Sequence, residues 1–111
     1  MIIGQTIFAG TFYSQWFPRQ GNAAVFSGEM IAHSGSGTLT IVVETKNLSD
    51  TDVSGTLVGG TVQWTSLDDT TKATSGAATG AKELVRFKYV FAASANGWTH
   101  FRVLAPAWCP N

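Results

Sequence analysis

The chain has 111 residues, of which 44% are hydrophobic and only 13% are charged. This length fits one domain over residues 1–111, because two separate cores would each bury too little surface. Seven basic and seven acidic residues give a formal net charge of zero. The basic residues are scattered along the chain, whereas nucleic-acid binding needs a concentrated basic patch, so nucleic acid is not an expected partner.

The first residues have neither the basic segment nor the apolar run of a signal peptide, and no stretch approaches the ~20 apolar residues of a membrane span. We therefore expect neither secretion by that route nor membrane insertion. Cys109 is the only cysteine, so no disulfide can form within the chain. A lightly charged surface repels its neighbours weakly, which favours association with copies of the chain or with a partner.

Apolar alternation and frequent Thr, Val and Gly favour strands over helices along the whole chain. The first predicted strand covers residues 2–8, and an aromatic segment at 11–17 ends before Pro18. Residues 23–33 and 38–46 form the next two predicted strands. The short Ser-Gly link between them predicts a long hairpin.

A further strand is predicted at residues 56–67, with a bend or bulge at Gly59 and Gly60. The polar stretch that follows, residues 68–82, contains nothing apolar larger than alanine. It is expected to form an exposed loop.

The clearest strand is residues 83–92, where apolar and charged side chains alternate, so one face is predicted to be buried and the other wet. A strand at 98–104 follows, and the turn residues Asn96 and Gly97 predict a hairpin between these two strands. The tail, residues 105–111, is too rich in proline to extend a sheet.

These elements amount to about seven strands with no intervening helix. The predicted fold is all-β: a single antiparallel β-sandwich of two sheets, jelly-roll-like or Ig-like, with a small barrel as the alternative.

Residues that could support chemistry are few and scattered. His33, His100 and Cys109 lie far apart in the sequence and do not have the spacing of zinc ligands. Cys109 lies two residues from the end of the sequence, where a nucleophile is poorly held, and no serine lies in a recognisable nucleophile motif. We therefore expect no enzymatic activity, no metal and no cofactor.

Carboxylates occur in two clusters, Asp50 with Asp52 and Asp68 with Asp69. Oxygen ligands of this kind could hold calcium, but neither cluster has the twelve-residue loop with a closing Glu. Their expected role is turn formation, because aspartate side chains bond to nearby backbone N–H groups.

Thirteen aromatic residues are many for this length, and several flank turns or lie near the C-terminal end of the sequence. Such rings are interpreted either as anchors that fill a partner's pocket or as plugs that close one end of the sandwich. Trp16, Trp64 and Trp98 would form a sugar-binding platform only if all three faced solvent. Burial of at least two of them is the stronger expectation.

The N-terminal apolar strand, the Thr- and Gly-rich strands, the low charge and the open polar stretch at 68–82 together resemble the small β-sandwich proteins that decorate or cement bacteriophage capsids, and other minor virion proteins. The resemblance implies a non-enzymatic structural protein of the virion, assembled in the host cytoplasm. It implies binding to a capsid or other shell protein as a homo-oligomer, often a trimer.

An oligomer is expected to use apolar side chains at chain ends and strand edges, where unpaired strands need cover. The interface candidates are Ile2, Ile3, Ile7, Phe8, Tyr13, Trp16, Phe17 and Trp108. The alternative function is a carbohydrate-binding module that uses exposed tryptophans.

Overall fold

The structure, a computed structural model, describes residues 3–21, 23–51, 53, 55–57, 59–65, 72–93 and 97–109, with the backbone alone at residues 3–6. Within these ranges the regular structure is all β-strand, and no helix there is long and apolar enough to cross a membrane. The strands are β1 (Ile3–Phe8), β2 (Gly10–Tyr13), β3 (Phe17–Pro18), β4 (Ala23–Ser34), β5 (Gly37–Lys46), β6 (Gly55–Thr56), β7 (Val62–Trp64), β8 (Lys72–Thr79), β9 (Leu84–Ala93), β10 (Trp98–Val103) and β11 (Ala107–Cys109).

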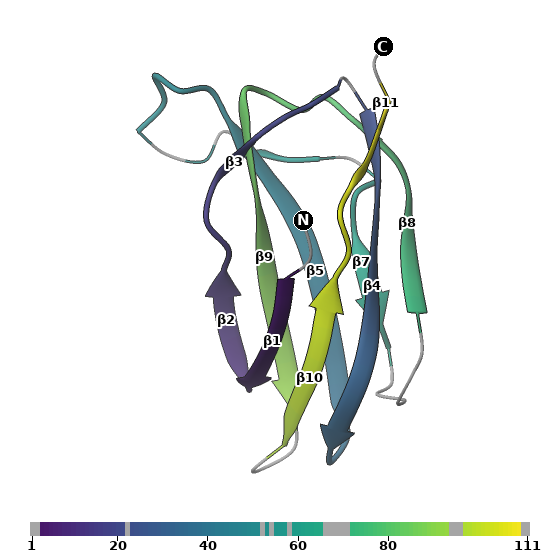
Figure 1. The fold of residues 1–111 in the computed structure, drawn as a ribbon. Coiled ribbons are helices and arrows are strands. Elements are labelled where there is room, and N and C mark those ends of the chain that lie inside the picture. The colour runs from purple at the N-terminus through teal and green to yellow at the C-terminus, as the bar shows by residue number, and fades with distance from the viewer. Residues whose placement is uncertain are drawn as a thin grey trace.

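These strands form two antiparallel sheets that pack face to face (Figure 1). In sheet A, β1 pairs with β10, and β10 pairs with β4. β11 continues along the same side of β4 as β10, and β8 pairs with the opposite side of β4. Sheet B has the order β2-β9-β5-β6, with β3 beside β9 and β7 beside β5. The predicted all-β, two-sheet antiparallel sandwich is confirmed.

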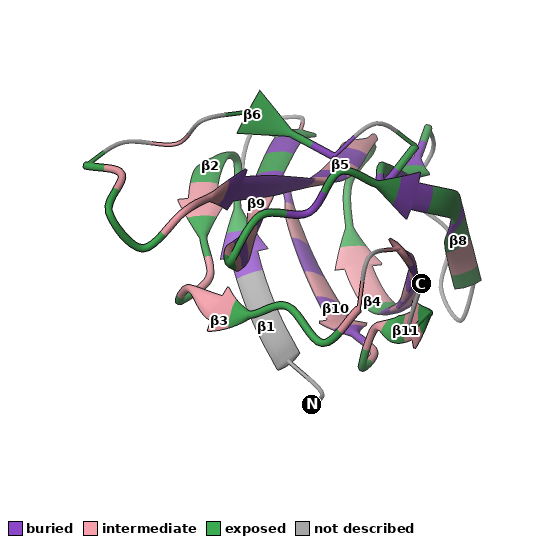
Figure 2. Ribbon diagram, turned by 90° about the horizontal axis from the view of Figure 1, so that it is seen from above, coloured by how far each residue is buried: buried purple, intermediate pink, exposed green. Residues whose placement is uncertain are grey.

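The core lies between the sheets and follows the alternation seen in the sequence, so that buried residues alternate mostly with half-buried ones along β9 and β10 (Figure 2). The inward residues of β9 are Val85, Phe87, Tyr89 and Phe91. Phe87 lies at the centre of an aromatic cluster, with its ring 5.4 Å from that of Phe17 and 5.9 Å from that of Phe26. Trp64 and Phe101 are buried in this core as well.

Both predicted hairpins are wrong, because each pair of strands is divided between the sheets. β4 and β10 lie in sheet A, whereas β5 and β9 lie in sheet B. Phe26 and Met30 of β4 share one core with Leu39 and Ile41 of β5. The alternation of apolar and polar residues identifies the side chains that face the core. It does not show which of the two sheets a strand joins, because strands of both sheets face the same core. Gly35, with a φ of 81°, lies in the link that carries the chain from one sheet to the other.

The expected loop at residues 68–82 is also wrong over most of its described part, because Lys72–Thr79 forms β8 and pairs with β4. Its small side chains bury little apolar surface, yet Ala78 reaches the core and the Phe26 N–H donates to the Ser75 hydroxyl at 2.9 Å. Backbone pairing with β4 therefore outweighs the weak strand propensity of this segment. Residues 68–71 lie outside the described ranges.

The tail does extend the ladder, contrary to the expectation from its prolines. Ala107–Cys109 forms β11, which pairs with the first residues of β4. Pro106 precedes the strand, so it removes no ladder hydrogen bond from within it. The ring of Trp108 packs edge-on against Phe26 at 6.2 Å, which ties the tail to the core.

Two predicted strands are interrupted. The strand expected at 56–67 is divided into β6 and β7, and the predicted bend lies at Gly59, whose φ is 82°. The aromatic segment expected at 11–17 is divided into β2 and β3. The first strand, expected at residues 2–8, is confirmed as β1 over its described part.

Tyr89 carries a buried polar group at the centre of this core. Its hydroxyl has no hydrogen-bond partner among the described residues. The nearby Ser14 hydroxyl accepts from the Phe87 N–H and donates to the Gln15 carbonyl, and its approach to the Tyr89 hydroxyl lacks the geometry of a hydrogen bond. Burial raises the pKa of Tyr89 from 10.0 to about 12, and the proximity of Ser14 opposes this rise only in part.

Tyr89→Phe should therefore stabilise the protein at neutral pH by roughly 1 kcal/mol, because it removes an unsatisfied buried hydroxyl. A raised pKa means that the unfolded chain ionises first. The free energy of unfolding is therefore unaffected by this ionisation below about pH 10 and falls as the pH rises from 10 towards 12. Urea unfolding from pH 7 to 12 should show this fall in the wild type and a smaller one in the variant.

Tyr13→Phe is the matched control, because the Tyr13 side chain is exposed. It should leave both the neutral stability and the alkaline fall unchanged. An alkaline fall that is identical in the wild type and Tyr89→Phe would contradict the assignment to Tyr89.

Candidate functional site

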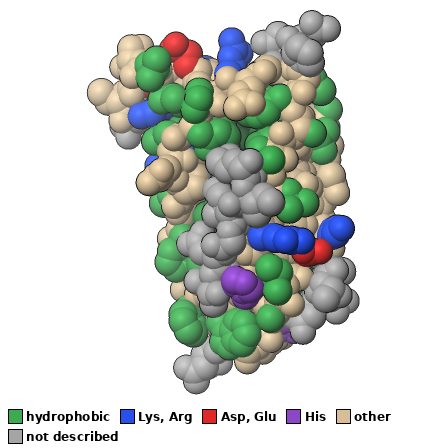
Figure 3. All heavy atoms as spheres, in the orientation of Figure 1, with side chains coloured by type: hydrophobic (Ala, Val, Ile, Leu, Met, Phe, Trp, Pro, Cys, Tyr) green, Lys and Arg blue, Asp and Glu red, His purple; other side chains and the backbone are tan. Residues whose placement is uncertain are grey.

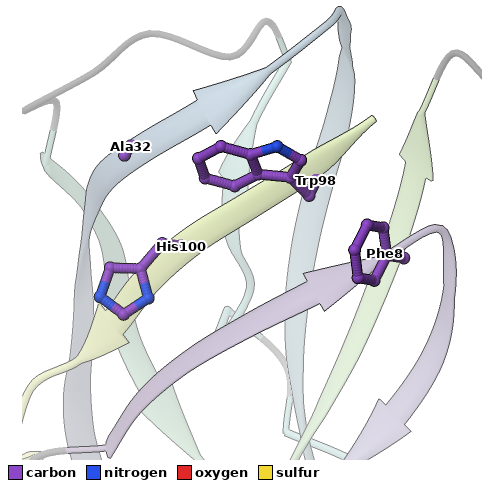
Figure 4. A pocket seen from close by; sticks show the side chains of 4 residues that line it. All are labelled: Phe8, Ala32, Trp98 and His100. Atoms are coloured by element: carbon purple, nitrogen blue, oxygen red, sulfur yellow. The ribbon is translucent and has the colours of Figure 1, made fainter. Parts of the chain in front are cut away.

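An aromatic hollow lies on the outer face of sheet A. It is lined by Phe8 of β1, Trp98 and His100 of β10, and Ala32 of β4 (Figure 4). The strand register brings these residues together, since Phe8 lies opposite Trp98 and His100 lies opposite Ala32. The hollow is shallow and its lining is mostly apolar, with Phe8 61% exposed. Exposing so much of an aromatic ring to water is unfavourable in free energy unless a partner covers the ring.

A β-bulge widens this apolar face. The register of β10 against β4 shifts between His100 and Phe101, so that Ile31 has no paired residue in β10. Ile31 is 38% exposed, next to Ala32 of the hollow. Bulges re-aim side chains in this way and are common where a sheet carries a site. We call Phe8, Ile31, Ala32 and Trp98 the sheet A patch.

Charges near the sheet A patch are paired with each other. Arg102 and Glu29 lie opposite one another in β10 and β4, and the Arg102 Nη2 is 2.5 Å from the Glu29 Oε1. The space-filling view of this face shows hydrophobic side chains gathered at its lower end, beside a histidine and below a group of basic and acidic side chains (Figure 3). The ion pair leaves little net charge beside the patch, so an uncharged or apolar partner surface fits it best.

A second cluster lies on sheet B, where aromatic rings enclose a cation. The Arg86 guanidinium carbon lies 4.2 Å from the ring centre of Tyr13 and 4.6 Å from that of Trp16. Its Nε donates to the Glu44 carboxylate at 2.8 Å. The Lys46 ammonium lies 4.8 Å from the Trp16 ring centre. These contacts hold the segment between β2 and β3 against the sheet, so the cluster is explained by its role in the fold.

The interface candidates do not form a single surface. Ile2 lies outside the described residues, only the backbone of Ile3 is described, and Ile7 is buried in the core. Of the remainder, Phe8 belongs to the sheet A patch, whereas Tyr13 is exposed on sheet B.

Phe17 and Trp108 act as plugs at one end of the sandwich. Both are partly buried and pack against core rings, Phe17 against Phe87 and Trp108 against Phe26. They also line one small hollow between β3 and the tail.

Sequence reasoning missed most of the sheet A patch. Ile31, Ala32 and Trp98 were not among the interface candidates. The sequence signal for Trp98 was the alternation of its strand, because Trp98 and His100 lie on the opposite face from the buried Thr99 and Phe101. The bulge at Ile31 has no comparable signal in the sequence.

The tryptophan platform weighed for sugar binding is not formed. Trp64 is only 5% exposed and belongs to the core. Trp16 and Trp98 are half-buried and lie on different sheets, with Trp16 beneath Arg86 and Trp98 in the sheet A hollow.

The residues weighed as metal ligands are separated. His33 and His100 are half-buried on neighbouring strands, and His33 lies opposite Thr99, so the two histidines fall on opposite faces of sheet A. Cys109 is exposed in β11. Within the described ranges no three His, Cys, Asp or Glu residues lie close enough together to hold a metal ion.

Of the carboxylates weighed for calcium, Asp50 forms a turn: its carboxylate accepts from the Asn47 N–H at 2.8 Å. Asp52, Asp68 and Asp69 lie outside the described residues.

The fold and these surfaces define a two-sheet antiparallel β-sandwich that exposes aromatic side chains on both sheets. Comparison of the chain with models of protein families, with curated proteins and with solved structures found no match.

Proposed function

We propose that this protein is a non-enzymatic structural protein that binds and stabilises a protein shell, as the decoration or cement proteins of virions do. The observation that carries the proposal is the sheet A patch, which places exposed Phe8 and Ile31 beside a half-buried Trp98. Aromatic side chains in an apolar hollow are typical anchors of protein interfaces. The partner proposed for this patch is a subunit of the shell.

The low charge of the chain supports the same proposal. A formal net charge of zero gives little repulsion between neighbouring copies on a crowded lattice. A protein that binds only the assembled shell stabilises it by mass action, and many equivalent contacts add up over the lattice. Modest affinity at each patch is sufficient for this role.

The test is the binding of purified chain to particles of the virus that encodes it, after the endogenous copies have been stripped. The wild type should rebind at fixed, symmetric positions, seen by electron cryomicroscopy and counted by quantitative mass spectrometry. Ile31→Asp should reduce the number of bound copies about tenfold or more, because it places a charge within an apolar contact.

Val90→Asp is the matched control. Val90 is 37% exposed, nearly as much as Ile31, but it lies on sheet B. This variant should bind like the wild type, and circular dichroism should show that both variants are folded. Failure of the wild type to bind would contradict the proposed function, and equal binding by Ile31→Asp would contradict the role of the patch.

A carbohydrate-binding module is the second candidate, favoured by Trp98 and His100 in one open hollow. An aromatic ring can stack on a sugar ring while an imidazole supplies a hydrogen bond. Binding to a glycan array that is lost in Trp98→Ala and kept in Trp16→Ala would favour this candidate over shell binding.

A further inference from the structure

β1 forms an open edge of sheet A. It is the outermost strand of that sheet and pairs with β10 on one side (Figure 1). Among the described strands, no other pairs with it. Every second residue of this six-residue strand therefore turns its N–H and C=O groups toward a margin where no described strand accepts them. An exposed edge of this kind is a template for pairing with another strand.

The other sheet margins are short, interrupted or covered. β8, at the far side of sheet A, begins with Lys72 and has a register shift in its pairing with β4. The turn at Gly59 also approaches β8, since a Cβ there would lie 3.1 Å from the Ala77 carbonyl oxygen. In sheet B, β2 has four residues, and β3 has two and includes Pro18. At the opposite margin, β6 and β7 have two and three residues.

β1 has none of these protections. Its sequence, IGQTIF, contains no charged residue and no proline, and its pairing with β10 shows no register shift. Natural proteins block open edges with lysine, proline or bulges, unless the edge is used. We propose that two copies of this chain pair through β1, antiparallel and about a two-fold axis, and so join their A sheets into one.

The alternation of β1 restricts the register of this pairing. Ile7 is buried and Phe8 is exposed, so inward residues of one copy must lie opposite inward residues of the other. A two-fold axis at Thr6 meets this condition and places Phe8 of each copy opposite Gly4 of the other. Because glycine has no side chain, the exposed Phe8 ring can lie over the neighbouring backbone, an arrangement that stabilises strand pairs.

A second copy fits this edge in charge as well. β1 brings no like charges together at the axis, and the chain has no net charge to oppose association. The pairing also places the two sheet A patches on the same face of the joined sheet, because Phe8 is exposed on the outer face of each copy and lies only two residues from the axis. This inference deepens the proposed function by naming the copy-to-copy contact, and it replaces the trimer implied by the resemblance with a dimer.

The test is sedimentation equilibrium of the purified full chain without any shell. The wild type should have the mass of two chains. Thr6→Lys and Thr6→Glu should each weaken dimerisation about tenfold or more, because each places two like charges opposite one another at the axis. An equimolar mixture of the two variants should restore the dimer, which a folding defect could not do.

The matched controls are Thr11→Lys and Thr11→Glu, which place the same charges in β2, the edge strand of sheet B. They should dimerise like the wild type. A wild-type monomer, a trimer, or a dimer that is insensitive to the Thr6 variants would overturn the proposal. Because no shell is present, these outcomes are independent of the particle-binding test of the proposed function.

Discussion

Phe87→Ala is expected to destabilise the protein by about 4 kcal/mol, because it empties the centre of the core. Phe87 is fully buried, and its ring packs against those of Phe17, Phe26 and Tyr89. These neighbours come from both sheets and from the β3 edge, so no single strand can move to fill the cavity. A loss of this size is a large fraction of the stability of a domain of this length, so partial unfolding at 37 °C is expected.

Chemical denaturation followed by tryptophan fluorescence measures this loss. Phe8→Ala is the control with the same change in side chain, because Phe8 is 61% exposed and should cost less than about 1 kcal/mol. Similar losses in the two variants would mean that Phe87 is not the centre of the core.

Trp108→Ala is expected to cost about 2 kcal/mol, less than a fully buried tryptophan, because Trp108 is only partly buried. The ring packs on Phe26, and the β11 backbone pairs with β4, so its loss should also loosen β11. The expected result is a lower melting temperature together with faster amide exchange at residues 107–109.

Cys109→Ser serves as the control, since Cys109 is exposed in the same strand. It should leave both quantities close to the wild type. An unchanged melting temperature in Trp108→Ala would show that the tail does not support the sandwich.

The fold class could be predicted because burial of one face of a strand requires an apolar residue at every second position of the sequence. The alternation at residues 83–92 correctly predicted one buried face of β9, and that face carries Phe87 and Phe91. It could not assign strands to sheets, because a strand facing the core from either side has the same pattern. This is the physical reason why both predicted hairpins were wrong.

Strands held by backbone pairing were also beyond prediction. β8 consists of small and polar residues, and β11 lies between prolines, so neither has a strand signal of its own. Both form because β4 offers a twelve-residue backbone with partners on both sides. Strand propensity depends on such neighbours more than on the segment itself.

The candidate site was predicted only in part for a similar reason. Phe8 could be named from its place in the apolar first strand. Trp98, Ala32 and Ile31 join it only through the β1-β10-β4 register and the bulge, which are properties of the assembled sheet. Each of them alone has the pattern of an ordinary strand residue.

Pairing of β1 between two copies is tested most directly by amide hydrogen exchange measured at two protein concentrations. Above the dimerisation constant, amides within residues 3–8 should exchange much more slowly than they do below it, whereas those of β2 should be unchanged. The contrast is expected because only β1 gains backbone hydrogen bonds from the second copy. Exchange in β1 that is rapid and identical at both concentrations would contradict the pairing.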